Sequence, residues 1–196
     1  MAQKIKIKQL TSGLETSGKT LLSDGSGLLS FGYSQSEKGT IFPIKPVNGD
    51  KFYYLIDNEE YIFDGVRDKW LSLKRETIIL GRNSIAFNVS AYLGIADNVH
   101  SSTSGILMKY NGTILSASID NNNNNMNSDR IIEIRVNNSL SNKVVLTILN
   151  GTKSISVNNA NINFESGDIL HSIALNNDVE PSLENISLII EIAKRN

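Results

Sequence analysis

From about residue 76 onward, short alternating apolar runs recur along the chain and are separated by turn residues. Alternation with a period of two is typical of a strand with one face on a core and one in water. Short strands at this spacing indicate an all-β fold, a β-sandwich of the jelly-roll kind. The predicted strands cover residues 85–93, 105–110, 113–119, 130–136, 143–149, 152–157, 162–164, 169–174 and 186–193.

Two Asn-Gly dipeptides mark turns in this region, at residues 111–112 and 150–151. Asn-Gly tolerates the positive φ angles of a tight hairpin turn. The first dipeptide is therefore predicted to join strands 105–110 and 113–119 as a hairpin.

The run KVVLTIL is apolar on both of its faces. Val144, Leu146 and Ile148 point to one side, and Val145 and Leu149 to the other. Such a strand is typically buried on both sides. Because an obligate interface resembles a divided core, Val144, Leu146 and Ile148 are the candidates for an oligomer interface.

The last apolar segment fits two periods. Leu183, Ile186 and Ile190 would form a helical stripe, whereas Ile186, Leu188, Ile190 and Ile192 would share one face of a strand. β-Branched residues favour the strand, so this segment is predicted to close the sandwich.

The stretch GDKFYYLIDNEEYIFDGVRDKWLS, residues 49–72, predicts a small hairpin module. Two alternating runs flank the turn at residues 57–59, and Asp64-Gly65 is a second turn that tolerates positive φ. A lone hairpin is marginal in water, so the module is expected to dock on something larger. Its predicted core consists of Phe52, Tyr54, Ile56, Tyr61, Phe63 and Trp70. The alternative use of its tyrosines and tryptophan is stacking on sugars.

Residues 1–40 combine a short alternating run with a segment rich in glycine and serine. Ile5 and Ile7 lie on one face of that run and the lysines on the other, and the rest has the composition of an extended arm. The residues predicted to anchor this arm to a partner are Lys4, Ile5, Ile7, Leu21, Leu22, Leu28 and Leu29. The lysines would alternatively contact nucleic-acid phosphates.

Overall charge and composition argue against several partners. The formal net charge is −1, so no global field draws the chain to nucleic acid or to an anionic membrane. There are no cysteines, hence no disulfides and no thiolate metal site. No run approaches the ~20 apolar residues of a membrane span, and the first residues are not predicted to be a signal peptide.

Candidate reactive groups are few. His100 and His171 are the two histidines, and a hydrolase would need one of them beside an activated serine. The run DNNNNNMNSD has oxygen ligands suited to Ca²⁺ but lacks the spacing of an EF-hand, so a solvated loop is the favoured interpretation. The acidic residues that a glycosidase would use are Glu59, Glu60, Asp64, Asp68 and Asp168. We expect no catalytic residue, no cofactor and no metal, and hence no enzyme.

Three parts of the sequence together resemble the appendages of tailed-phage virions. KIKIKQL with its Gly/Ser arm is similar to the attachment ends of phage fibres, and the module at residues 49–72 resembles a short module of such fibres. GILMKYNGTI, FESGDIL and ISLIIEI resemble trimeric jelly-roll heads, including those of the complement and tumour-necrosis-factor type. The nearest resemblance is to head-fibre or tail-fibre proteins of crAss-like phages. No sustained heptad repeat, and so no coiled-coil shaft, is present.

This resemblance implies a non-enzymatic protein of the virion. It implies a homotrimer with a virion-anchoring arm (residues 1–40), the β-hairpin module (residues 41–75) and an oligomerising jelly-roll-like sandwich (residues 76–196). The expected partners are copies of the chain, other capsid or tail proteins, and a host-surface glycan as an alternative.

Overall fold

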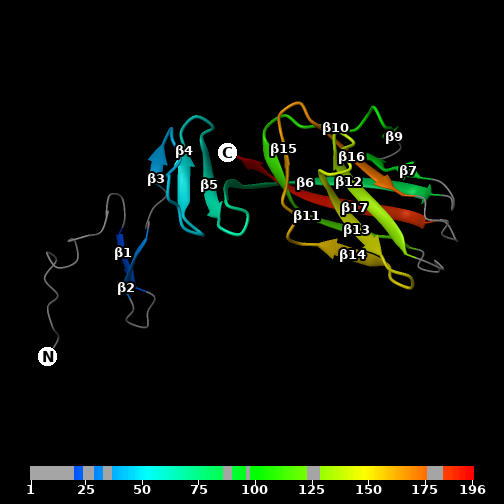
Figure 1. Ribbon diagram of the computed structural model, residues 1–196, viewed down its shortest axis with the longest axis horizontal. Coiled ribbons are helices and arrows are strands. Elements are labelled where there is room, and N and C mark those ends of the chain that lie inside the picture. The colour runs from blue at the N-terminus through cyan, green and yellow to red at the C-terminus, as the bar shows by residue number, and fades with distance from the viewer. Residues whose placement is uncertain are drawn as a thin grey trace, which may run out of the picture. The chain divides into compact units, whose positions relative to one another are not determined.

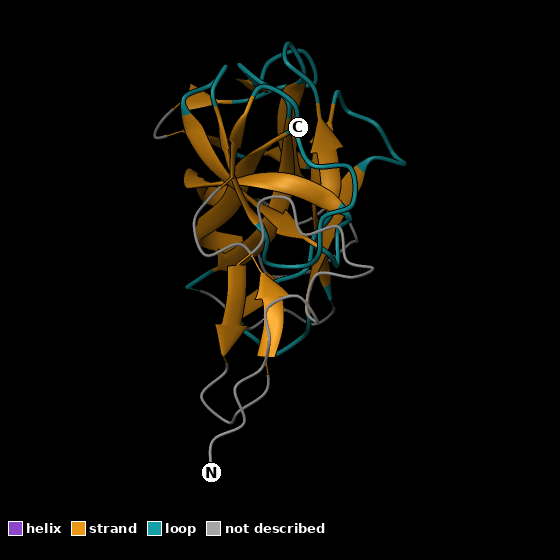
Figure 2. Cartoon of the chain, turned by 90° about the vertical axis from the view of Figure 1, so that its left-hand side faces the viewer, coloured by secondary structure: helices purple, strands orange, loops and turns teal. Residues whose placement is uncertain are grey.

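The computed structural model is built of strands (Figures 1 and 2). It describes residues 20–23, 29–32, 37–85, 90–95, 98–122, 129–175 and 183–196. The all-β prediction is confirmed, and no helix in these ranges is long and apolar enough to cross a membrane. The chain divides into two compact units, Met1–Leu73 and Lys74–Asn196. The three-part division expected from the sequence stays a prediction.

The first described part of the amino-terminal unit is a small hairpin. β1 (Thr20–Ser23) pairs antiparallel with β2 (Leu29–Gly32). Two short paired strands therefore lie within the segment predicted as an arm, and they carry three of its leucines: Leu21, Leu22 and Leu29. The remaining predicted anchoring residues, Lys4, Ile5, Ile7 and Leu28, lie outside the described residues.

The hairpin module forms the rest of this unit. β4 (Lys51–Tyr54), β5 (Glu59–Asp64) and the first residues of β6 (Lys69–Ile85) pair antiparallel in chain order, and β3 (Glu37–Gly39) joins β4 in parallel. Both connecting turns end in a left-handed residue, Asn58 at φ 55° and Asp68 at φ 53°. The positive φ expected at Asp64-Gly65 thus falls at Asp68 instead. Gly65 is explained by a close approach, because a Cβ there would lie 2.8 Å from Asn48 Cβ.

Aromatic rings make up the module's core. Phe52, Tyr61 and Trp70 are buried, as predicted. Tyr54, Phe63 and Phe42, the last of which was not anticipated, pack against them. Ile56 is a correction: it lies in the four-residue turn between β4 and β5 and is 67% exposed, because β4 ends at Tyr54.

The carboxy-terminal unit is a sandwich of two sheets. In one sheet β11 and β17 are central, with β14 and β15 along one side of β11 and β6 beside β17; β8 and β9 extend from β6. In the other, the order is β10-β16-β12-β13, with β7 also on β16 (Figure 1). The strands are β7 (Ala91–Tyr92), β8 (Gly94–Ile95), β9 (Asn98–Val99), β10 (Ile106–Leu107), β11 (Gly112–Asp120), β12 (Arg130–Val136), β13 (Lys143–Ile148), β14 (Ser154–Val157), β15 (Ile162–Phe164), β16 (Ile169–Ala174) and β17 (Leu183–Arg195).

The final segment is a strand, as predicted. Ile186, Leu188, Ile190 and Ile192 of β17 are all buried, whereas the residues between them are more exposed. This two-residue period places the four side chains in the core between the sheets, and no helical stripe forms.

The Asn-Gly dipeptide at residues 111–112 does not make the predicted hairpin, whereas the one at residues 150–151 does form a turn. β10 pairs with β16, so Gly112 does not join it to β11. A Cβ at Gly112 would lie 2.3 Å from Phe164 Cζ, so close packing requires glycine there. Gly151 has the expected positive φ of 78°, but its turn leads from β13 in one sheet to β14 in the other.

β13 is buried on one face only within the single chain. Val144, Leu146 and Ile148 belong to the core of their own sandwich. The candidate interface side chains are therefore already covered, because the opposite sheet supplies their neighbours. Val145 and Leu149 remain 41% and 50% exposed and are the apolar surface that this segment offers to another molecule.

Candidate functional site

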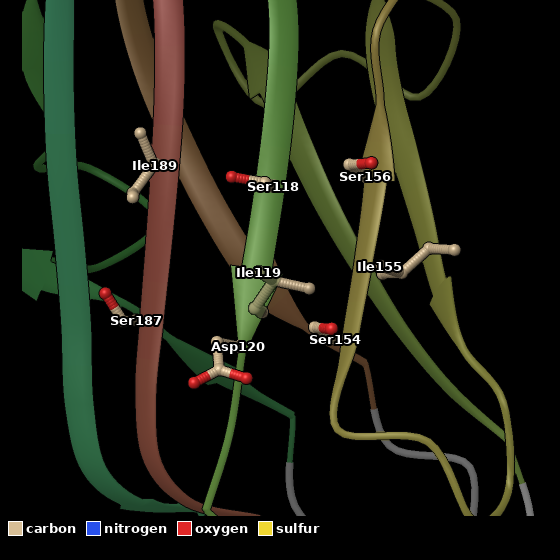
Figure 3. A pocket seen from close by; sticks show the side chains of 8 residues that line it. All are labelled: Ser118, Ile119, Asp120, Ser154, Ile155, Ser156, Ser187 and Ile189. Carbon is tan, nitrogen blue, oxygen red and sulfur yellow. The ribbon is translucent and has the colours of Figure 1, made fainter.

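A shallow groove runs along the outer face of the sheet formed by β14, β11 and β17 (Figure 3). Its volume is about 560 Å³. The lining residues are Ser118, Ile119, Asp120, Ser154, Ile155, Ser156, Ser187 and Ile189. Four of the eight lining residues are serines, and these short side chains leave open space above the sheet.

Strand register arranges the outward side chains in two rows. Ser118 is the pairing partner of both Ser156 and Ile189. Asp120 is likewise the partner of both Ser154 and Ser187. Figure 3 shows the same two levels, with Ser118 beside Ser156 and Asp120 beside Ser154.

Sequence reasoning did not identify this groove. Its signal in the sequence lies in three short segments, SASID (residues 116–120), SIS (residues 154–156) and NIS (residues 185–187). In each of them polar residues, mainly serine, alternate with Ala or Ile. Each segment resembled an ordinary strand with a wet face. The three segments meet only through the register of β11 with β14 and β17.

The two histidines lie close together on the outer side of the other sheet. His171, on β16, is buried, and its Nδ1 lies 3.1 Å from the carbonyl oxygen of Ser101, so Nδ1 is the protonated nitrogen. Burial, together with the nearby His171, lowers the pKa of His100. Within the described residues, neither histidine hydrogen-bonds to a hydroxyl or a carboxylate. The nucleophile–base pair of a hydrolase is thus not formed by these residues.

Glu133 forms a charged cluster on the same outer face. Its carboxylate accepts from Arg135 Nε at 2.7 Å and pairs with Lys143. Burial by itself would raise the pKa of Glu133, but the hydrogen bonds from Lys143 and Arg135 outweigh burial and lower it. Arg135 is also the pairing partner of His171 across β12 and β16, so this cluster extends to the histidines.

Turn chemistry accounts for the candidate carboxylates whose contacts are described. Asp64 Oδ1 accepts hydrogen bonds from the backbone nitrogens of Val66 and Arg67. Burial by itself would raise the pKa of Asp64, but these hydrogen bonds and the Arg67 guanidinium outweigh burial and lower it. Asp168 accepts from Asn137 Nδ2 and Glu165 N in a loop. These bonds fix turns.

Potential metal ligands are dispersed. Among the described residues, no group of three or more His, Cys, Asp or Glu side chains lies together. In the run from Asp120 to Asp129, Asn121 Nδ2 donates to Lys153 O, and Asp129 Oδ1 accepts from Asn150 N. Residues 123–128 of the proposed Ca²⁺ loop lie outside the described residues.

Polar side chains tie the loops at one end of the sandwich. Asn137 Nδ2 donates to Asp168 Oδ1 at 2.6 Å, and Asn111 Oδ1 accepts from Ser166 N. The backbone nitrogen of Arg195, next to the last residue, donates to Asn111 O at this same end.

Comparison with known proteins gives little. No protein family model matches the chain, and no curated protein matches it in sequence. Among solved structures, the chain is similar to the PRD1 vertex protein P5, with a TM-score of 0.40 and 17% sequence identity. The match covers 79% of this chain and 86% of that one. At this TM-score nothing about the present chain follows from the likeness.

Proposed function

We propose that this chain is a non-enzymatic structural protein of a bacteriophage virion, a homotrimeric head fibre or capsid decoration. The observation that supports this most is the apolar surface of the hairpin module. Six of its aliphatic side chains are more than half exposed: Ile41 (81%), Ile44 (92%), Val47 (59%), Leu55 (51%), Ile56 (67%) and Val66 (83%). A folded unit this small, with so much exposed apolar surface, is typical of a part that docks on a partner.

Attachment to the particle is assigned to residues 1–40. Ile5 and Ile7 would add a strand to an exposed sheet edge of a capsid or tail protein, with Lys4 on the wet face. The leucines of the arm, Leu21, Leu22, Leu28 and Leu29, would fill pockets on that partner. The sandwich would carry the trimer contact, with Val145 and Leu149 as the apolar residues that β13 and the turn after it leave exposed.

The sandwich has a polarity that fits this role. Arg75 lies at the beginning of the sandwich, and its Nε is 3.9 Å from Glu191 Oε1. Glu191 is four residues before Arg195, whose backbone nitrogen bonds to Asn111 at the end where the loops are tied together. The chain therefore begins and ends the sandwich near one end. The described turn at residues 149–153 lies at the opposite end, beside the pair of Asp120 and Ser154, and would be presented outward.

The test is the mass of the purified chain in solution, with and without residues 1–40. We expect a stable oligomer from both, and we expect the shortened chain to be missing from purified particles. A monodisperse monomer from both chains would contradict the proposal.

Binding of a host-surface glycan is the second candidate function, as for the receptor-binding part of a tail fibre. The serine-lined groove is the specific observation that favours it.

A further inference from the structure

We infer that the serine-lined groove on β14, β11 and β17 is a binding site for a neutral hexopyranose, exposed at the end of a glycan. This inference names a site and a ligand class for the adhesion part of the proposed function, and it rests on that part. It is carried by an array of polar side chains that make no hydrogen bond or ion pair to the described part of the chain.

The polar groups of the groove have no described partner within the chain. The hydroxyls of Ser118, Ser154, Ser156 and Ser187 and the carboxylate of Asp120 make no hydrogen bond or ion pair to any described residue. Four of the five side chains are exposed, and Ser118 is half-buried between its neighbours. By contrast, Ser116 and Glu191, one step further along the same strands, bond to each other at 3.1 Å. Among the described residues, the groove is therefore a part of this face with unused hydrogen-bonding capacity.

The array has the spacing of a small ligand with several hydroxyls. Neighbouring strands lie about 4.8 Å apart, and side chains two residues apart on one strand lie about 6.7 Å apart. Two rows on three strands thus offer polar groups over an area suited to one or two sugar rings. The volume of about 560 Å³ is within the range of small-molecule sites.

The chemistry of the lining suits sugar hydroxyls. Each serine both donates and accepts, and the Asp120 carboxylate accepts from two donors such as adjacent hydroxyls. Ile189, 43% exposed in the upper row, offers an apolar contact for the C–H face of a ring. A second copy of the chain fits this surface less well, because the centre of a protein interface is typically apolar or aromatic.

Charge selects among sugars. Asp120 is the ionisable side chain of the groove lining, and it is acidic. A uronic acid, a sialic acid or a phosphate would place its anion near this carboxylate, and like charges repel. The groove therefore favours neutral rings over anionic ones.

Affinity for one sugar is expected to be low, with a dissociation constant on the order of 1 mM, since the groove is open and has no aromatic ring. Several copies on one particle would raise the overall affinity through multivalency. The probe therefore has to be sensitive to weak binding.

The experiment is saturation-transfer difference NMR on the full-length chain with methyl glucoside, methyl galactoside, methyl mannoside and methyl glucuronide. Ser118→Val fills the middle of the groove and removes a hydroxyl. Asp120→Asn removes the charge and keeps the shape. Thr147→Val is the matched control, because it removes a hydroxyl from β13 on the other sheet.

The wild-type chain should transfer saturation to at least one neutral glycoside and not to the glucuronide. Ser118→Val should abolish the transfer and Thr147→Val should preserve it, whereas Asp120→Asn should weaken the neutral sugar and admit the glucuronide. The inference is overturned if no neutral glycoside receives saturation, if Ser118→Val leaves the transfer intact, or if the wild type takes the glucuronide equally well. If the chain is found in particles but binds no sugar, this site is overturned and the structural role stands. If the chain binds a sugar but is absent from particles, the structural role is rejected.

Discussion

The two units of this chain solve the problem of a hydrophobic core in different ways. The hairpin module buries three large aromatic rings and leaves most of its aliphatic side chains in water. The sandwich buries rows of isoleucine, leucine and valine from two facing sheets. Aromatic rings bury the most area per residue, so a few of them stabilise a unit that has room for little else. The difference indicates that the sandwich is stable by itself, whereas the module depends on its rings and on whatever covers its aliphatic surface.

The largest effect is expected from Phe52→Ala in the module. Phe52 is 2% exposed, and its ring centroid lies 6.0 Å from that of Trp70. Truncation of such a ring lowers the free energy of unfolding by about 3–5 kcal/mol. The module is small, so this loss is expected to unfold it. Fluorescence of Trp70, the single tryptophan, should shift to the red while the thermal transition of the sandwich by circular dichroism stays in place. Ile56→Ala is the control and should change neither. A joint shift of both signals would show that the two units unfold together and would break the comparison.

Leu146→Ala tests the sandwich in the same way. Leu146 is fully buried in the core, and its truncation should lower the free energy of unfolding by about 2–5 kcal/mol. Trp70 fluorescence at low temperature should not change. Leu107→Ala, at a 62% exposed position on β10 of the same sheet, should stay within about 0.5 kcal/mol of the wild type in denaturant titrations. Equal losses for the two variants would mean that exposure of a side chain in the single chain does not predict the cost of its truncation in this sheet.

How far the sequence predicts this molecule depends on the range of the interaction that decides each feature. The strand at Ile186–Ile192 followed from local alternation, and so did the rings of the module. The predicted burial of Ile56 was wrong because the position at which β4 ends depends on the turn. The predicted hairpin at Gly112 was wrong because the residue that requires glycine there, Phe164, is distant in the sequence.

The candidate groove was beyond sequence reasoning for the same physical reason. Ser118, Ser156 and Ser187 are ordinary wet positions on three separate strands. Their alignment is set by the pairing of β11 with β14 and β17, which depends on packing across the whole sheet. The meeting of His100 and His171 likewise arises from a loop that passes over β16.

Glu133→Gln sharpens the comparison by testing polar rather than apolar burial in the sandwich. The Glu133 side chain is 4% exposed and bonds both Arg135 and Lys143. Its loss should cost about 1–3 kcal/mol, because two cations lose their shared partner. Since the folded-state pKa of Glu133 is lowered, its contribution is present above the ordinary carboxyl pKa of 4.5 and is lost as the pH falls below it. The unfolding midpoint of the Glu133→Gln variant should therefore fall less steeply than that of the wild type as the pH is lowered.

Glu191→Gln is the control, because the ion pair of Glu191 is longer and more exposed. It should lower the free energy of unfolding by at most about 1 kcal/mol.

The smallest effect is expected from the histidines and should be confined to the sandwich, since the module contains none. His100 has a lowered pKa, so the folded state favours its neutral form and binds fewer protons than the unfolded chain. Its contribution is complete above the ordinary histidine pKa of 6.5 and falls as the pH drops below that value. Protonation would place a positive charge near His171, which is paired across the strands with Arg135.

The melting temperature of the sandwich should therefore decline between neutral and mildly acidic pH. His100→Leu should reduce that decline without affecting Trp70 fluorescence. A decline of the same size in the variant would assign the pH dependence to other groups, and a pH-dependent change at Trp70 would show that the module responds as well.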